Sequence, residues 1–318
     1  MTNTKSWEGV LVAIATPFKE DLSIDFERLQ EHVAWLAANG CHGIVPNGSL
    51  GEYQTLTDDE RASIVTAVIE AAPDGVSVVP GVGAYGGHQA RRWAEQAAAA
   101  GAHAVMSLPP NAYAASPAEV VAHYEAVASA GLPVIAYNNP FDTKVDLTPE
   151  LLADLYDRGL IGAVKEFSGD VRRLHRIHEL APGLDVLAGA DDVLLELVTQ
   201  GAAGWIAGFP NALPEQSVRL YELCREGNLA EALPLYRQVH AAYRWDSKPL
   251  FVQAIKLGME LAGRYGGPCR LPRLPLSPEL HAQVTADMLR ALKSEAPGGA
   301  DGAVPPSSLL GRAGAGDA

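Results

Sequence analysis

Short apolar runs alternate with segments rich in Ala, Leu and Glu eight times between residue 9 and about residue 226. Several of these segments open with Asp, Ser or Thr, the residue types that cap helix N-termini. A strand followed by a helix eight times over predicts an α/β fold, a parallel (β/α)8 TIM barrel spanning residues 1–226. A doubly wound open sheet is the competing architecture, but eight units in about 220 residues favour closure. The expected strands are 10–15, 42–46, 76–81, 104–108, 133–137, 161–165, 185–188 and 204–207.

After the eighth unit the pattern changes to helices alone. Residues 227–295 predict a small C-terminal helical appendix, with helices over 228–243, 248–262 and 277–292. Residues 296–318 contain few large apolar side chains, so burial cannot offset the entropy lost on ordering them. We expect a disordered tail there.

Charge, hydropathy and cysteine usage exclude several classes of partner. The formal net charge of -14 repels a phosphate backbone, so no nucleic-acid partner is expected. No apolar run approaches the roughly 20 residues that span a bilayer, and the first residues lack the layout of a signal peptide. The three cysteines are odd in number and contain no CxxC pair, which is typical of a reducing compartment. The sequence predicts a cytoplasmic protein with no membrane role.

Lys165 is an unusual residue for its position. It ends the apolar run 160–164, where a buried parallel strand normally continues with aliphatic side chains. A desolvated lysine has a lowered pKa, and its neutral amine attacks carbonyl carbons to form a Schiff base. A snorkelling or salt-bridged lysine at a strand end is the alternative. The position alone favours neither.

Polar and glycine-rich clusters follow four of the expected strands. They are residues 47–53, residues 137–140, Lys165 and residues 189–192. In a parallel barrel the carboxyl ends of all strands meet at one mouth, where active sites lie. The glycine-flanked Ser49-Leu50 pair offers unobstructed N–H groups for a carboxylate, unless the segment is a plain turn. Tyr137 offers a phenol for proton transfer, unless it only packs in the core.

Three of these segments carry a family resemblance. They read GSLGE at 48–52, YNNP at 137–140 and VKE at 164–166. In order and spacing they resemble the GxxGE motif, the YNxP motif and the lysine strand of the dihydrodipicolinate synthase / N-acetylneuraminate lyase superfamily. That superfamily contains class I aldolases, dehydratases and deaminases that act on 2-oxo acids. The likeness covers roughly residues 8–293.

The resemblance implies a Schiff-base mechanism. Lys165 would condense with the ketone of a 2-oxo acid, while Tyr137, held by the Ser49 hydroxyl, relays protons. The substrate carboxylate would lie on the N–H groups of Ser49 and Leu50. The remaining substrate-binding residues implied in this way are Gly48, Gly189, Ile206, Asn139 and Asp142, with Gly189 and Ile206 lining the ketone pocket. The resemblance further implies a homo-oligomer, either a dimer or a tetramer.

The sequence departs from the lysine-biosynthesis members of that superfamily at three places. Asp142 stands where an arginine typically receives the carboxylate of the aldehyde substrate, and Leu50 replaces a threonine. Asn111-Ala112 replaces a tyrosine pair, with Tyr113 one step away. We therefore expect a catabolic dehydratase, deaminase or aldolase. The alternatives are a 4-hydroxy-tetrahydrodipicolinate synthase and a barrel that binds 2-oxo acids without turnover.

No metal and no cofactor are expected. The glycine pattern GVGAYG at 81–86 matches a dinucleotide fingerprint, but the acidic residue expected about 20 positions later is missing. His175 and His178 lie one helical turn apart among arginines, without a third ligand. Asp191 and Asp192 are interpreted as the cap and first-turn acids of a helix.

Overall fold

The computed structural model describes residues 5–293, so the predicted tail at 296–318 lies outside the described residues. Eight parallel strands are arranged in the order β3-β2-β1-β8-β7-β6-β5-β4. Beyond β3, a parallel bridge between Gly81 and Met106 connects this end of the sheet with β4. The strands are β1 (Gly9–Ala13), β2 (Gly43–Val45), β3 (Ser77–Val78), β4 (Val105–Ser107), β5 (Val134–Asn138), β6 (Ala163–Glu166), β7 (Asp185–Ala188) and β8 (Gly204–Ala207).

The strand order decides between the two architectures that the sequence allowed. β1 pairs in parallel with both β2 and β8, so the first and last strands are neighbours. A doubly wound open sheet does not join its first strand to its last, whereas a barrel does. The predicted (β/α)8 barrel is therefore confirmed, and each strand begins within two residues of its expected start.

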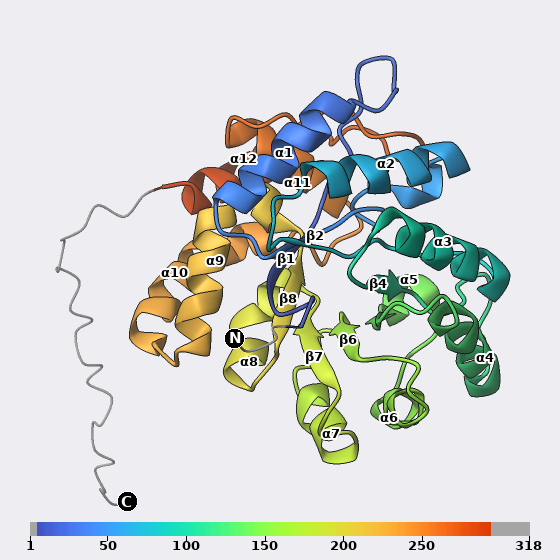
Figure 1. Ribbon diagram of the computed structural model, residues 1–318. Helices are drawn as coiled ribbons and strands as arrows, with labels where there is room; N and C mark the ends of the chain where they lie inside the picture. The colour runs from blue at the N-terminus through green and yellow to red at the C-terminus, as the bar shows by residue number, and fades with distance from the viewer. Residues whose placement is uncertain (1–4, 294–318) are drawn as a thin grey trace, which may run out of the picture.

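Helices follow the strands and surround them (Figure 1). Thr57 and Ser116 cap two of these helices through complete capping boxes with Glu60 and Glu119, as their sequence positions suggested. The barrel helices are α1 (Phe26–Ala38), α2 (Asp58–Ala71), α3 (Gly87–Ala100), α4 (Pro117–Ala128), α5 (Pro140–Thr143), α6 (Pro149–Asp157), α7 (Arg173–Leu180), α8 (Leu194–Thr199) and α9 (Pro214–Arg225), with short 3-10 turns η1 (Tyr53–Thr55), η2 (Asp191–Val193) and η3 (Phe209–Asn211).

Three further helices follow α9, as the sequence predicted. They are α10 (Leu229–Tyr243), α11 (Phe251–Leu261) and α12 (Pro278–Ala291). These helices pack on one another and, through α10, on α9 (Figure 1). The segment between α10 and α11 reaches the barrel mouth, because Asp246 lies against Gly208 at the end of β8. Within residues 5–293, no helix has both the length and the apolar character needed to cross a bilayer.

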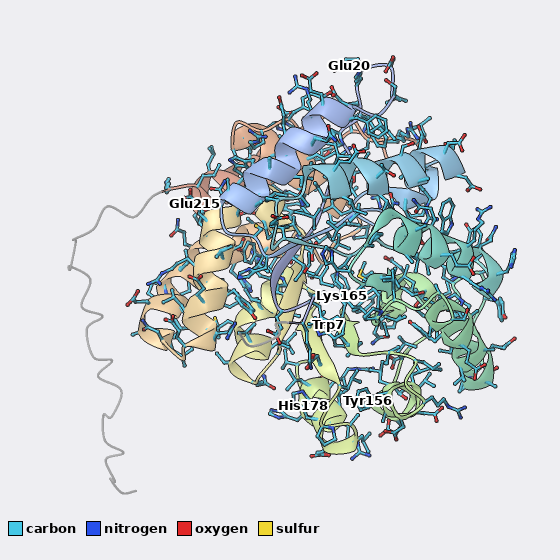
Figure 2. The ribbon with its side chains drawn as sticks, in the orientation of Figure 1. Trp7, Glu20, Tyr156, Lys165, His178 and Glu215 are labelled. Carbon is cyan, nitrogen blue, oxygen red and sulfur yellow. The ribbon has the colours of Figure 1, made fainter. Side chains whose placement is uncertain are left out.

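The barrel strands form the core of the molecule. Nearly every strand residue is buried, and bulky side chains such as Leu11, Ile135 and Trp205 fill the space inside and around the sheet. Lys165 lies near the middle of this arrangement, whereas Glu20, His178 and Glu215 lie at the periphery (Figure 2).

Candidate active site

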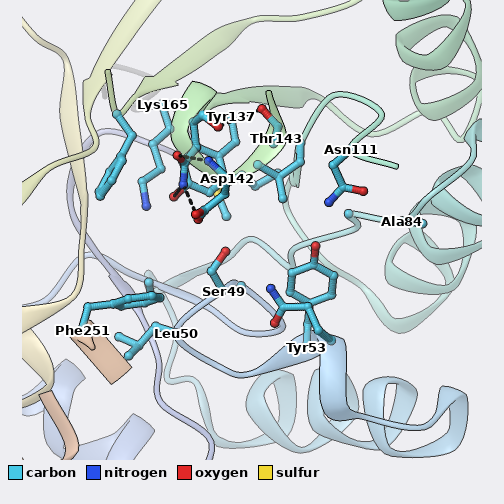
Figure 3. Close-up of a pocket in the computed structure, with 18 of the residues that line it drawn as sticks. Ser49, Leu50, Tyr53, Ala84, Asn111, Tyr137, Asp142, Thr143, Lys165 and Phe251 are labelled. Atoms are coloured by element: carbon cyan, nitrogen blue, oxygen red, sulfur yellow. Dashed lines mark hydrogen bonds between the residues drawn. The ribbon is translucent and has the colours of Figure 1, made fainter. Parts of the chain in front are cut away.

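A cavity of about 670 Å³ opens at the carboxyl ends of the strands (Figure 3). Its wall combines the segment after β2, the ends of β5 and β6, and the segment between α10 and α11. The residues predicted from sequence that line it are Gly48, Ser49, Leu50, Tyr137, Asn139, Asp142 and Lys165. The structure thus brings seven of the nine predicted site residues together, although they come from three separate segments of the chain.

Lys165 lies in β6 with 6% of its surface exposed. Its Nζ is 4.5 Å from the ring centroid of Tyr137 and 5.7 Å from that of Phe167. Burial lowers the pKa of Lys165, while the negative charges of Asp246 and Asp191 oppose this shift. The described residues provide no salt-bridge partner for this ammonium. The snorkelling or salt-bridged lysine considered from sequence does not describe this side chain.

Tyr137 lies beside Lys165 because β5 and β6 pair in a register that places these two residues opposite each other. The Tyr137 ring packs edge-on against Phe167, at a centroid distance of 6.3 Å. Burial raises the pKa of the Tyr137 phenol, so the group keeps its proton at neutral pH. The Nδ2 of Asn139 donates to its hydroxyl oxygen at 3.3 Å.

Ser49 lines the cavity, and its hydroxyl points into the open space (Figure 3). Among the described residues, however, the Tyr137 hydroxyl has Asn139 rather than Ser49 as its hydrogen-bond partner. The backbone N–H groups of Ser49 and Leu50 donate to no acceptor within residues 5–293. They are therefore available to an anionic group in the cavity.

The segment that carries Ser49 is held from behind by Glu52. This residue adopts a left-handed backbone conformation with φ of 56°. Its buried carboxylate accepts from the Nζ of Lys256 at 2.9 Å and from the backbone N–H of Arg270 at 3.0 Å. The C-terminal region thereby fixes the loop that follows β2.

Asn139 and Asp142 both line the cavity, and Figure 3 shows Asp142 there. Asn139 caps α5, because its Oδ1 accepts from the N–H of Asp142 at 3.3 Å. Its Nδ2 donates to the Asp142 carboxylate at 2.9 Å. Asp142 is exposed at the mouth, so solvent screens its charge in part.

Gly189 and Ile206 do not line the cavity. A Cβ on Gly189 would lie 2.4 Å from the carbonyl oxygen of Glu166, so glycine is required there for β7 to approach β6. Ile206 is completely buried in the barrel core and pairs with Leu11 of β1. The structure therefore gives these two residues a packing role and does not bring them to the predicted ketone pocket.

Comparison with known proteins gives one consistent result. The model of the dihydrodipicolinate synthetase family matches residues 6–291. A 4-hydroxy-tetrahydrodipicolinate synthase of Methanosphaerula palustris is 34% identical over 295 residues, which cover 91% of this chain and 99% of the relative. An uncharacterised DapA-like lyase of Halobacterium salinarum is 33% identical and covers 88% of this chain and 92% of its own.

The chain belongs to the dihydrodipicolinate synthetase family. It is thus an enzyme of the lyase class, in a family that binds small-molecule substrates. Two solved structures share the fold. The dihydrodipicolinate synthase of Aquifex aeolicus superposes with a TM-score of 0.84 at 26% identity, covering 89% of this chain and 98% of that one. YagE, a prophage protein of E. coli bound to pyruvate, has a TM-score of 0.83 at 28% identity and the same coverage.

Two tyrosines near the mouth, Tyr113 and Tyr53, differ in whether they line the cavity. Tyr113 is 53% exposed, donates to Glu119 at 3.0 Å and does not line the cavity. Tyr53, which directly follows the GSLGE motif, is buried and does line it (Figure 3). Burial raises the pKa of Tyr53, while the amide of Asn111 lowers it. Sequence reasoning missed Tyr53, although its place beside the motif was a usable signal.

Asp191 and Asp192 both lie in the first turn of η2, as interpreted from the sequence, but the interpretation of Asp191 as the helix cap is wrong. Its side chain caps no helix, because the N-cap position of η2 is Ala190. Instead, the completely buried carboxylate accepts from the indole Nε1 of Trp205 at 3.0 Å and from the N–H of Phe209 at 2.8 Å. It also accepts from the N–H of Gly208. Asp191 therefore fixes the end of β8 beside the cavity.

Close backbone packing explains part of the glycine pattern at 81–86. A Cβ on Gly81 would lie 2.3 Å from the carbonyl oxygen of Asn47. Gly83 and Ala84 line the cavity next to Tyr53.

Within residues 5–293, no group of three or more His, Cys, Asp or Glu side chains is placed to hold a metal ion.

Proposed function

We propose that this enzyme is a Schiff-base lyase that acts on a 2-oxo acid, or on a related imino acid, through Lys165. The observation that carries the proposal is the buried Lys165 amine, which faces the Tyr137 ring inside a cavity large enough for a small substrate. Burial favours the neutral amine, the form that attacks a carbonyl carbon. YagE, which shares the fold, binds pyruvate.

Each part of the wall supports one step of this chemistry. The N–H groups of Ser49 and Leu50 receive the substrate carboxylate, which orients the ketone toward Lys165. In the protonated imine the nitrogen is an electron sink, so a proton can leave the carbon next to the C=N bond to give an enamine. Tyr137, which keeps its proton at neutral pH, transfers protons to and from the adduct.

We further propose that the second half of the reaction is catabolic: a dehydration, a deamination or an aldol cleavage. Asp142 and Asp246 both line the cavity, and carboxylates oppose a second anionic substrate. A leaving hydroxyl or amino group does not meet this repulsion.

In keeping with its family, we propose that the enzyme works in the cytoplasm as a homo-oligomer, a dimer or a tetramer.

A second candidate is 4-hydroxy-tetrahydrodipicolinate synthase. Relatives with that name are 34% identical and cover most of this chain. Purified enzyme supplied with pyruvate and aspartate semialdehyde distinguishes the two reactions. Rapid formation of the cyclic product supports the synthase, whereas release of water, ammonia or pyruvate from hydroxylated 2-oxo acids or pyrroline carboxylates supports the catabolic lyase.

Borohydride trapping tests the first half of the reaction, which both candidates share. Incubation with pyruvate and borohydride should add one reduced pyruvate to the wild-type chain, measured by intact mass. The Lys165→Ala variant should add none. Lys144→Ala is the matched control, because Lys144 is exposed and does not line the cavity. An adduct that persists in Lys165→Ala would refute the assignment of the lysine. Absence of any adduct with 2-oxo acids in the wild type would favour a barrel without turnover.

A further inference from the structure

Asn138 and Glu166 directly follow the two residues that carry the proposed chemistry. In the register between β5 and β6, Tyr137 is opposite Lys165, and Asn138 is opposite Glu166. Successive side chains of a strand point to opposite faces of the sheet, so Asn138 and Glu166 turn away from the cavity, and neither lines it. Asn138 is completely buried and Glu166 is only 2% exposed. Two buried polar side chains thus lie back to back with the Tyr137–Lys165 pair.

A hydrogen bond joins these two side chains across the strands. The Nδ2 of Asn138 lies 3.1 Å from each carboxylate oxygen of Glu166. The Oδ1 of Asn138 accepts from the backbone N–H of Leu147 at 2.9 Å, which fixes the orientation of the amide. At the same level the N–H of Phe167 donates to the carbonyl oxygen of Asn138 at 2.9 Å. Since β5 and β6 both end at this pair of residues, the side-chain bond lies at the end of the strand pairing.

The turn and the helix that follow β6 hold the carboxylate of Glu166. Its Oε1 accepts from the N–H of Ser168 at 2.7 Å, and its Oε2 accepts from the Nε of Arg173 at 3.1 Å. Arg173 also pairs with Asp146 at 3.1 Å, and Asp146 accepts from the amide of Asn138 at 3.2 Å. These contacts compensate the burial of the charge. We call the four side chains the strand clasp: Asn138, Asp146, Glu166 and Arg173.

Proton transfer depends strongly on the separation of the two strands at this level. Tyr137 exchanges a proton with an adduct on Lys165 only within hydrogen-bond reach, about 2.6–3.2 Å. A misplacement of about 1 Å can cost about 100-fold in rate. The Tyr137 ring and the Nζ of Lys165, whose distance is 4.5 Å, come from different strands. Their relative position is therefore set by whatever joins the ends of β5 and β6.

We propose that Asn138 and Glu166 are positioning residues that hold Tyr137 within reach of the substrate carbon bound to Lys165. The proposal rests on the proposed function, because it requires an imine on Lys165 and proton transfer by Tyr137. The strand clasp does not line the cavity and takes part in no bond-making step. It acts through the separation of the two strands. Loss of the Asn138–Glu166 bond should therefore slow proton transfer on carbon more than it lowers the amount of imine.

Two measurements with pyruvate separate these effects. Borohydride trapping and intact mass give the fraction of the chain that carries the imine. Enzyme-catalysed exchange of the pyruvate methyl protons in D2O, followed by NMR, gives the rate of proton transfer on carbon. Asn138→Ala removes the cross-strand bond and leaves Ser168 and Arg173 on the carboxylate. We expect the trapped fraction to stay near that of the wild type, and the exchange rate per trapped imine to fall by at least about 10-fold.

Glu166→Gln tests the other side of the same bond. Its amide keeps the shape of the side chain but places a donor opposite the Nε of Arg173, which now binds a carboxylate oxygen. The exchange rate per trapped imine should fall here too, with the trapped fraction near that of the wild type. This variant also serves if Asn138→Ala does not fold.

The matched control is Tyr221→Phe. It removes the hydrogen bond from the Tyr221 hydroxyl to the carbonyl oxygen of Ala203 at 2.9 Å, just before β8 and away from the cavity. Its exchange rate per trapped imine should equal that of the wild type. An unchanged exchange rate in the folded clasp variants would overturn the proposal, as would an equal loss in Tyr221→Phe. If the wild type itself forms no imine, the proposed function fails, which is a different result because it does not depend on the variants.

Discussion

The buried pair of Lys256 and Glu52 joins the C-terminal helices to the loop that carries Ser49. Lys256 and Glu52 side chains are 3% and 0% exposed, and their Nζ and Oε1 atoms are 2.9 Å apart. Replacing Lys256 with Met keeps most of the side-chain volume but leaves a buried carboxylate without its cation. Loss of one partner from a buried pair costs about 3–5 kcal/mol. The remaining bond from the N–H of Arg270 places the expected loss at the low end of that range.

Urea unfolding followed by circular dichroism measures this loss. The matched control is Arg91→Gln, which breaks the exposed pair with Glu95, 2.7 Å long and half solvent-accessible on both sides. That change should cost about 0.5 kcal/mol at most. Adding Glu52→Gln to Lys256→Met should recover about 1 kcal/mol or more, since the uncompensated charge disappears. If Lys256→Met lowers the free energy of unfolding no more than Arg91→Gln does, this reasoning is refuted.

Three further predictions follow from the cavity and its supports. Tyr137→Phe should keep the fold and the contact with Lys165 but lower kcat by about 100-fold or more, because the phenol is lost; an unchanged kcat contradicts its role in proton transfer. Gly208→Ala should cost about 1–3 kcal/mol, since the new Cβ would lie 2.6 Å from Oδ1 of Asp246 and 2.8 Å from Cδ1 of Ile255; a free energy of unfolding equal to that of the wild type contradicts the close packing. Hydrogen bonding to Arg270 lowers the pKa of Glu60 to about 2, so its contribution is present above about pH 4.5 and is lost as pH falls toward 2. The urea midpoint of Glu60→Gln should therefore change less with pH than that of the wild type over this range of pH. An equal change of the midpoint with pH in both proteins would contradict the prediction.

Local patterns were sufficient to predict the barrel. An apolar run of strand length, followed by a helix with Thr57 or Ser116 as its cap, is recognisable without knowledge of the rest of the chain. The same reasoning placed Lys165 and Tyr137 at strand ends, because parallel strands present their carboxyl ends at one mouth. It could not show that the two residues face each other, which depends on the register between β5 and β6.

Residues whose role depends on distant partners were missed or misread. Asp191 resembles a helix cap in sequence, but its partners are Trp205 and the backbone at the end of β8. Gly189 resembles a site residue, but it serves the close approach of β7 to β6. Asp246 lies in a helical region with no motif around it, so nothing local pointed to the cavity.

The sequence by itself determined the alternation of strands and helices, the family and the chemical type of the central lysine, because periodicity and short motifs are local properties of the chain. The tertiary structure decided which polar groups lie buried near Lys165. Burial lowers the pKa of that lysine and raises the pKa of Asp246, and burial exists only once the barrel has closed and the C-terminal segment lies across its mouth. The reactivity of the lysine is thus a property of the folded molecule.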